Sequence, residues 1–217
     1  TGTPQAAMVT SAPSRSLRAL PISKGSAPSK RTGVSFRQPR MKVGPLRRSA
    51  SLRACRVSSA SAGTITAGGT TVRGFVINRF ASGNGVVLFT AGGNTIVGNF
   101  LGTNAAGTAA LANQGGVNVN IGSPGNTIGG DAPEDRNVIS GNSTGVFLNT
   151  SGNLVRGNRI GTDPTGQIAV GNVNGINEQH GGNTIEHNLV SGNTGLGISL
   201  TSPTAPTTVQ DNFIGVD

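Results

Sequence analysis

The residues best suited to chemistry lie in one short stretch, NEQHGGNTIEHN at positions 177–188. This stretch holds both histidines of the chain and two of its eight acidic residues. Carboxylates and imidazoles together can coordinate Zn²⁺ or act as an acid/base pair. The alternative is a set of ordinary contacts, in which Glu186 pairs with Arg156 across neighbouring strands. The candidate catalytic residues are Glu178, His180, Glu186 and His187.

A second charged group is the segment DAPEDR, in which Asp131, Glu134, Asp135 and Arg136 place three acids and one base on an inserted turn. A protruding turn of this kind can bind a ligand, and it can equally be a solvated loop. These four residues are the candidate binding residues.

The stretch GNRIGTDPTGQIAVGN at 157–172 resembles a ligand loop, but its pattern favours a turn. Asp163, Pro164 and Gly166 suit the first, second and fourth positions of a β-turn. The stretch GNFLGTNAAGTAALAN at 98–113 repeats the pattern with neither the aspartate nor the proline. A phosphate loop also requires a following helix, and no helix is indicated.

Composition divides the chain into two pieces. Its 217 residues include 35 Gly, and 3% are aromatic, which favours repetitive β structure over a core of large rings. The formal net charge is +9, yet residues 1–60 hold twelve of the seventeen Lys and Arg and none of the acids. Residues 61–217 therefore carry five basic residues against eight acidic ones, a net charge of −3. The overall basicity is no argument that the larger piece binds nucleic acid.

We predict that residues 1–60, rich in Ser, Arg and Pro, are disordered. Acid-poor leaders of this composition are typical of plastid or mitochondrial transit peptides; the alternatives are a basic tail or an extension that is not native to the protein. Cys55 is the single cysteine, so no internal disulfide can form. No apolar run reaches the roughly 20 residues that a membrane-spanning helix needs.

A repeat runs through residues 61–217. The tripeptide Asn-Thr-Ile, or a close variant, recurs at steps of 24, 32, 27, 30 and 24 residues, starting at Thr70, Asn94, Asn126, Asn153, Asn183 and Thr207. A Gly followed by Val or Ile recurs between these starts and opens an alternating apolar stretch. Three short strands in a unit of about 24 residues are typical of a parallel β-helix. The leucine lattice, hexapeptide period and calcium-binding nonapeptide of other solenoids are missing.

The strings TITAGGTTVRGFVINRF, NTIVGNFLGTN, RNVISGN and GNRIGTDPTG resemble the tandem right-handed β-helix repeats of large bacterial surface and secreted proteins, within the pectate-lyase-like superfamily. The resemblance covers about residues 62–217. It implies an all-β right-handed parallel β-helix, and a location at the cell surface or outside the cell. It leaves function open, because the superfamily includes lyases, hydrolases, epimerases and adhesins.

Two columns of polar residues follow from this repeat. An asparagine near one bend of each coil is expected to bond to its neighbours in a structural ladder of Asn99, Asn137, Asn158, Asn188 and Asn212. A second column is predicted to contain Asn104, Asn142, Asp163, Asn193 and Asp217. Its aspartates alternate with asparagines, which suits a structural ladder better than a calcium site.

A threonine column suggests ice binding as a minor alternative. It consists of Thr71, Thr95, Thr127, Thr184 and Thr208, and Leu154 interrupts it. A single interrupted column is narrower than the two-rank array that such a surface requires, and threonine favours strands in any case.

Glu178 is the strongest anomaly in the repeat, because it stands where other units have Leu88, Val119, Leu148 or Leu200. A carboxylate at an inward position either turns out to solvent or marks a functional pocket.

The sequence therefore predicts a β-helix of about six coils at 61–217 behind a disordered basic leader. The expected function is a non-catalytic scaffold with an elongated surface for carbohydrate or another protein. The alternative is a polysaccharide lyase, hydrolase or epimerase, or a fragment of one. We expect no cofactor and no metal, with calcium as the alternative, and no nucleic-acid partner. Because both ends of the repeat lack polar caps, we expect missing repeats or another chain to stack on them.

Overall fold

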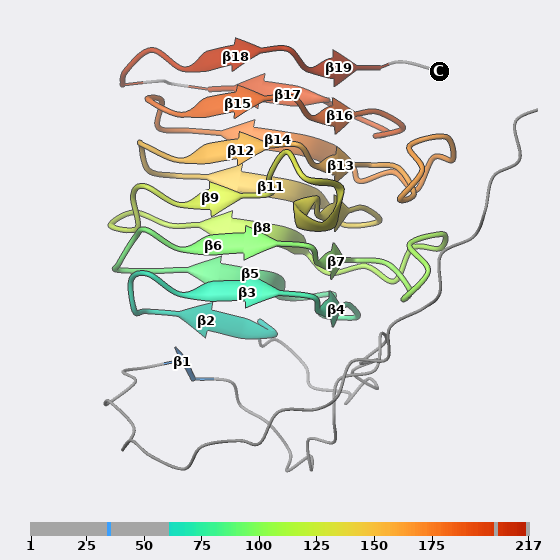
Figure 1. The fold of residues 1–217 in the computed structure, drawn as a ribbon, viewed down its shortest axis with the longest axis horizontal. Helices are drawn as coiled ribbons and strands as arrows, with labels where there is room; N and C mark the ends of the chain where they lie inside the picture. Colours follow the sequence, from blue (N-terminus) through green and yellow to red (C-terminus); the bar gives the residue numbers. More distant parts are fainter. Residues whose placement is uncertain (1–33, 36–60, 202–203, 216–217) are drawn as a thin grey trace, which may run out of the picture. The chain divides into compact units, whose positions relative to one another are not determined.

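The computed structural model describes residues 34–35, 61–201 and 204–215. In this part of the chain eighteen short strands, β2 to β19, wind into six stacked coils (Figure 1). Each coil contributes one strand to each of three parallel sheets, which we call A, C and B in the order in which the chain visits them. The chain is thus a right-handed parallel β-helix, as the repeat predicts.

The strands of each sheet follow one another at intervals of three. Sheet A contains β2 (Gly63–Ile65), β5 (Asn84–Leu88), β8 (Gly115–Val119), β11 (Thr144–Leu148), β14 (Asn174–Glu178) and β17 (Ile198–Leu200). Sheet C contains β3 (Thr71–Arg73), β6 (Thr95–Val97), β9 (Thr127–Ile128), β12 (Leu154–Arg156), β15 (Thr184–Glu186) and β18 (Thr208–Gln210). Sheet B contains β4 (Val76–Ile77), β7 (Phe100–Leu101), β10 (Val138–Ile139), β13 (Arg159–Ile160), β16 (Leu189–Val190) and β19 (Phe213–Ile214).

The core is made of columns of aliphatic side chains that point into the coil. On sheet C the inward column is Val72, Ile96, Ile128, Val155, Ile185 and Val209. On sheet B it is Ile77, Leu101, Ile139, Ile160, Val190 and Ile214. Side chains alternate across a strand, so in each two-residue strand of sheet B one residue fills the interior while the other faces outward. Many small β-branched residues thus replace the aromatic core that this chain cannot build.

The asparagine ladder predicted from the sequence lies at the bend between sheets C and B. The Nδ2 of Asn99 donates to the Oδ1 of Asn137 at 3.0 Å, and the chain of bonds continues through Asn158 and Asn188 to Asn212. Each Nδ2 also donates to a backbone carbonyl, as Asn158 does to Ile128 at 2.9 Å. Each Oδ1 accepts a backbone N–H of the preceding coil. These contacts satisfy polar backbone groups in a place that water does not reach.

The other two bends carry ladders of the same kind. The sequence predicted one of them in part, through Asn142 and Asn193, and missed the other. The bend between sheets A and C holds Asn94, Asn126, Asn153 and Asn183. The bend between sheets B and A holds Asn113, Asn142, Asn172 and Asn193.

The predicted second column is therefore wrong in two of its members. Asn104 and Asp163 lie in short hairpins inserted after sheet B, marked by the antiparallel bridges Thr103–Ala110 and Thr162–Ala169. The ladder positions in those coils are filled by Asn113 and Asn172, after each insertion. Asp217 lies outside the described residues.

Most of the predicted disordered leader, residues 1–60, lies outside the described residues. Two of its residues form β1 (Val34–Ser35), which pairs antiparallel with β2. Cys55 is not described. None of the described residues belongs to a helix long and apolar enough to cross a membrane.

The ladder makes a prediction about stability. Replacing Asn158 by Ala in the full chain removes the acceptor of Asn137 and the donor to Ile128, and leaves buried groups unpaired. We expect a loss of about 2–4 kcal/mol in the free energy of unfolding, measured by urea denaturation. The matched Asn212→Ala variant, in the partly exposed last coil, is expected to lose about 1 kcal/mol or less. Equal losses in the two variants would contradict the claim that burial makes the ladder bonds of Asn158 essential to stability.

Candidate functional site

Glu178 points into the coil and ends one of the ladders. Its side chain is 1% exposed, and its Oε1 accepts hydrogen bonds from the Nδ2 of Asn183 and the Oγ1 of Thr207. In the preceding coils the Nδ2 of each ladder asparagine donates to the asparagine of the next coil, but the sixth coil has Thr207 at this position. Glu178 supplies the acceptor that the threonine does not provide. The inward position was correctly predicted, whereas neither expected consequence, exposure or a pocket, is observed.

The two histidines lie at different bends. The Nδ1 of His180 is 3.3 Å from the Oγ1 of Thr204, at the bend between sheets A and C. His187 lies at the bend between sheets C and B, where its φ of 55° occupies a left-handed position that Gly98 and Gly157 fill in other coils. Its Nε2 lies 3.7 Å from the carboxylate of Asp211, which has the same backbone conformation one coil later.

Glu186 faces outward on sheet C and makes the cross-strand contact that the sequence indicates. Its Oε1 lies 3.5 Å from the Nε of Arg156 on the neighbouring strand, and its Oε2 accepts a hydrogen bond from Gln210 at 2.9 Å.

The four candidate catalytic residues thus occupy four separate environments: the interior, two different bends and the outer face of sheet C. No group of three His, Cys, Asp or Glu that could hold a metal ion occurs among the described residues. The structure does not bring them together into the zinc or acid/base arrangement that their spacing suggested.

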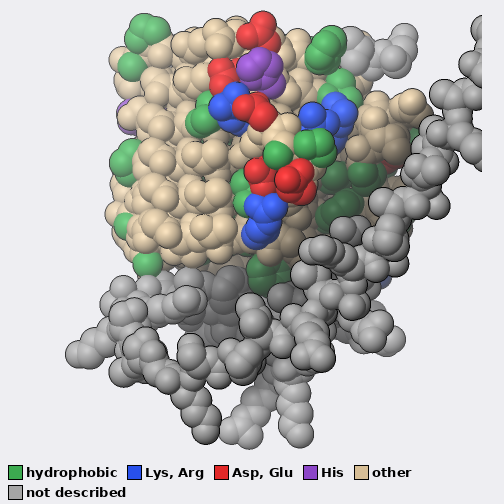
Figure 2. Space-filling model, in the orientation of Figure 1, with side chains coloured by type: hydrophobic (Ala, Val, Ile, Leu, Met, Phe, Trp, Pro, Cys, Tyr) green, Lys and Arg blue, Asp and Glu red, His purple; other side chains and the backbone are tan. Residues whose placement is uncertain are grey.

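The segment 131–136 folds back over the coil as a clamp. It forms a short 3₁₀ turn, η1 (Pro133–Asp135), and its acids pair with arginines on either side, Asp135 with Arg73 and Asp131 with Arg156. The backbone of Asp135 also accepts the N–H of Gly98 at 3.0 Å. Together with Glu186, His187 and Asp211 these side chains form one row of ionisable groups, which Figure 2 shows running up the visible face. Two of the four candidate binding residues, Asp131 and Asp135, are thus engaged in this clamp.

The clamp lies next to Val97, an outward-facing apolar residue that is buried. Val97 faces outward in register with Arg73, yet it is only 5% exposed and stands apart from the apolar core of the coils. The insertion 131–136 begins one coil later, and its residues return over Gly98, next to Val97. Glu134 and Arg136 form no ion pair within the described residues.

The stretch 157–172 is a turn, as its twin predicts. Asp163 is 2% exposed, and its carboxylate accepts bonds from the hydroxyl of Thr165 and the N–H groups of Gln167 and Ile168. Burial alone would raise the pKa of Asp163, but these hydrogen bonds outweigh it and hold the pKa below its ordinary value. Asn104 makes the equivalent bonds to Thr108 and Ala109 in the twin hairpin. All of these contacts stay within the hairpin.

The threonine column is present in the predicted register on sheet C, with Leu154 between Thr127 and Thr184. The neighbouring outward column contains Arg73, Val97, Arg156, Glu186 and Gln210. A second rank of threonines is therefore missing from this face, and ice binding has no two-rank array to rest on.

The outer face of sheet A differs from both other sheets because it is uncharged. Glu178 is the single ionisable residue in β2, β5, β8, β11, β14 and β17, and it points inward. One outward row consists of Thr64, Val87, Asn118, Phe147, Asn177 and Ser199. A second outward row consists of Asn84, Gly115, Thr144 and Asn174.

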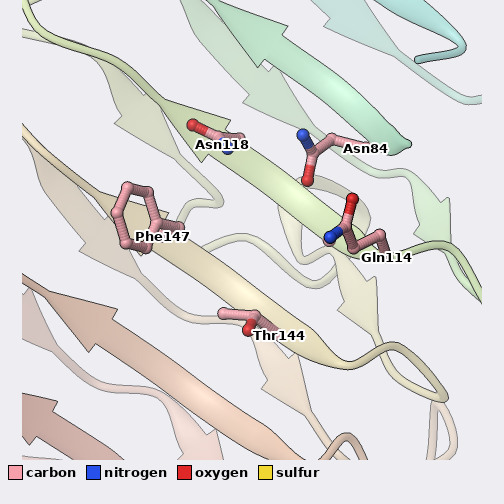
Figure 3. A pocket seen from close by; sticks show the side chains of 6 residues that line it. Asn84, Gln114, Asn118, Thr144 and Phe147 are labelled. Carbon is pink, nitrogen blue, oxygen red and sulfur yellow. The ribbon is translucent and has the colours of Figure 1, made fainter. Parts of the chain in front are cut away.

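A shallow pocket of about 200 Å³ lies between these two rows. Its lining residues are Asn84, Gln114, Gly115, Asn118, Thr144 and Phe147. Figure 3 shows Phe147 and Asn118 on neighbouring strands, with Asn84 and Gln114 across the pocket from them. Gly115 leaves the space: a Cβ at this position would lie 2.3 Å from the Oδ1 of Asn84. Sequence reasoning missed this pocket. The available signal was that the outward residues of the strands that begin at each Gly-Val or Gly-Ile carry no charge.

Phe147 lies between two amides that lack partners. Asn118 and Asn177 flank it in the same row, and the Oδ1 of each is buried without a hydrogen-bond partner. Unsatisfied amide oxygens beside a half-buried ring are unusual in a folded protein.

The role assigned to Glu178 is testable in the full chain by urea denaturation. Glu178→Ala leaves Asn183 and Thr207 without their acceptor and opens a cavity, so we expect a loss of about 2–4 kcal/mol in the free energy of unfolding. Glu178→Gln keeps an acceptor oxygen and nearly the same volume, and is expected to stay within about 1 kcal/mol of the wild type. A glutamine variant as unstable as the alanine variant would show that the acceptor is not what the coil requires.

The hydrogen bonds of Asp163 predict a dependence on pH. Because the pKa of Asp163 is lower in the folded state than the unfolded value of about 3.9, its contribution to stability is present above that value. The contribution is lost as the pH falls through the folded pKa. Asp163→Asn should therefore weaken the acid loss of unfolding free energy, and it should lose the contribution of the charged carboxylate at pH 7. Its amide can still accept the two backbone bonds that Asn104 accepts in the twin hairpin. Glu134→Gln, on an exposed residue outside any ion pair, is the matched control, and equal pH profiles for all three proteins would refute this account.

Comparison of the chain with protein-family models, curated proteins and solved structures found no match. The parallel β-helix rests on the strand register and the ladders described above.

Proposed function

We propose that residues 61–217 form a non-catalytic scaffold that binds neutral carbohydrate on the outer face of sheet A. The observation that carries this proposal is the row Asn118, Phe147 and Asn177, an aromatic ring between two amides on a face without ionisable side chains. The pocket beside it adds Asn84, Gln114 and Thr144.

The chemistry of these side chains suits a sugar. An aromatic ring offers a flat apolar surface for the C–H groups of a pyranose, and amides provide both donors and acceptors for its hydroxyl groups. A few placed polar groups around an apolar contact are typical of small-molecule sites.

The β-helix also favours a ligand longer than one sugar. Neighbouring strands of a sheet lie about 4.8 Å apart, so the outer rows repeat amide and hydroxyl groups at regular intervals along the coil axis. The inward halves of the same strands are locked in the core, which keeps these rows rigid before binding. A rigid, repeating surface fits a chain of repeating units.

Charge separates neutral from acidic ligands on this face. The acids and arginines of the described residues, apart from Glu178, lie on sheets B and C or at bends and insertions. A uronic acid or sulfated chain would meet no cation on the outer face of sheet A, so a neutral glycan is the better match.

The alternative of a polysaccharide-active enzyme receives no support from the residues that suggested it. Hydrolases of this kind need two carboxyl groups flanking the scissile bond, and lyases need a base beside the substrate acid. Glu178 serves a ladder and Glu186 an ion pair. From the resemblance of the repeat strings, we also propose that the β-helix belongs to the pectate-lyase-like superfamily. The same resemblance leads us to expect a secreted or surface location.

The proposal is tested by a glycan array probed with the labelled full chain. We expect binding to neutral glycans, and a loss of about tenfold or more in affinity for Phe147→Ala, because removing the ring removes its stacking contact. The matched control is Phe213→Ala, which removes an exposed phenylalanine on sheet B.

Circular dichroism checks that both variants keep the β-helix. Binding confined to acidic glycans, or an equal loss in the Phe213→Ala variant, would refute a site at Phe147. Absence of binding to any glycan would refute the carbohydrate proposal and leave a structural or protein-binding scaffold.

A further inference from the structure

Two arginines on neighbouring coils, close to the outer face of sheet B, form no ion pair with an acid among the described residues. Arg159 belongs to β13, and Arg136 ends the clamp segment two residues before the neighbouring strand β10. Their positions are fixed by the ladder: Asn137 follows Arg136, Asn158 precedes Arg159, and these asparagines are bonded at 2.9 Å. The two side chains therefore start from adjacent coils.

The hairpin 163–169 partly encloses the guanidinium of Arg159. A Cβ built on Gly166 would lie 3.4 Å from its Nε and Cζ atoms, and Leu189 flanks the same turn. The Nε is buried and has no hydrogen-bond partner. Asp163 is the acid of this hairpin, and its carboxylate already accepts hydrogen bonds from Thr165, Gln167 and Ile168.

The two arginines on sheet C, Arg73 and Arg156, behave differently. Arg73 and Arg156 both have carboxylate partners, whereas neither Arg136 nor Arg159 forms an ion pair within the part of the chain that the structure describes. Burial and the nearby charge of Arg136 lower the pKa of Arg159, and Asp163 only partly opposes them. Two like charges held together and partly desolvated favour a bound anion.

We propose that Arg136 and Arg159 form a binding site for a tetrahedral oxyanion, sulfate or phosphate. The planar guanidinium offers parallel N–H donors that match two oxygens of such a group, and two guanidiniums can share one anion. The site lies on sheet B and does not depend on the proposed glycan face of sheet A.

The test is thermal unfolding of the full chain in sodium sulfate, with sodium chloride at equal ionic strength as reference. Sulfate stabilises proteins in general through exclusion from their surface, so the informative quantity is the difference between variants. We expect sulfate to raise the midpoint of the wild type more than that of Arg136→Gln or Arg159→Gln. The matched control is Arg79→Gln, which removes an exposed arginine and should keep the full wild-type shift.

Arg136→Gln also guards against a folding artefact. Without sulfate this variant loses a like-charge contact, so its midpoint should equal or exceed that of the wild type at low salt. A separate readout is the ¹H–¹⁵N signal of the Arg159 Nε–H, which should shift on adding sulfate. Equal sulfate shifts in all four proteins, together with an unmoved Arg159 signal, would overturn the proposal.

Two further arms identify the source of the anion. Inorganic phosphate and a sugar phosphate such as glucose 6-phosphate are titrated against the same Arg159 signal. Similar affinities support a site for the free anion, and tighter binding of the ester supports a site for a phosphorylated or sulfated ligand. A response to neither phosphate nor sulfate would refute both.

Discussion

The fold depends on how its bends satisfy their backbone. A solenoid buries three bends in each coil, and every buried N–H and C=O there needs a partner. Asparagine provides an acceptor for the N–H of one coil, a donor for a carbonyl of that coil and a bond to the next asparagine. Three such ladders run along this chain, one at each bend. Where the column changes to Thr207, Glu178 stands at an inward strand position and accepts the hydrogen bond of the Asn183 Nδ2.

Because the ladders and the inward aliphatic columns fix the coils, the outward residues are free to differ from sheet to sheet. Sheet C carries threonines and a row of ion pairs closed by the segment 131–136. Sheet B is partly covered by two hairpins, which touch each other where Gly107 meets Pro164. Sheet A remains open and uncharged. The three faces thus offer three different chemistries on one framework, and the two proposed sites use different ones.

Much of this could be predicted from periodicity. Counting residues between landmarks predicted the three strands in each coil, the ladder through Asn158 and the inward position of Glu178. Counting failed where an insertion shifts the register: the hairpins move the ladder position from Asn104 to Asn113, and from Asp163 to Asn172. Counting also failed for contacts between coils of unequal length, such as the ion pair of Asp135 with Arg73. It did not show that Arg136 lies close enough to affect the charge of Arg159. The pocket at Phe147 depends on which side chains share an outer row, which only the register reveals.

The central claim is that asparagines of this chain serve two separate purposes, ladders inside and a ligand surface outside. The most direct test records the side-chain amide signals of the ¹⁵N-labelled full chain while a neutral glycan identified on the array is added. The account predicts slowly exchanging, unmoved signals for ladder residues such as Asn126 and Asn158, and shifted signals for Asn84, Asn118 and Asn177. Shifts spread equally over both groups, or confined to the ladders, would contradict it.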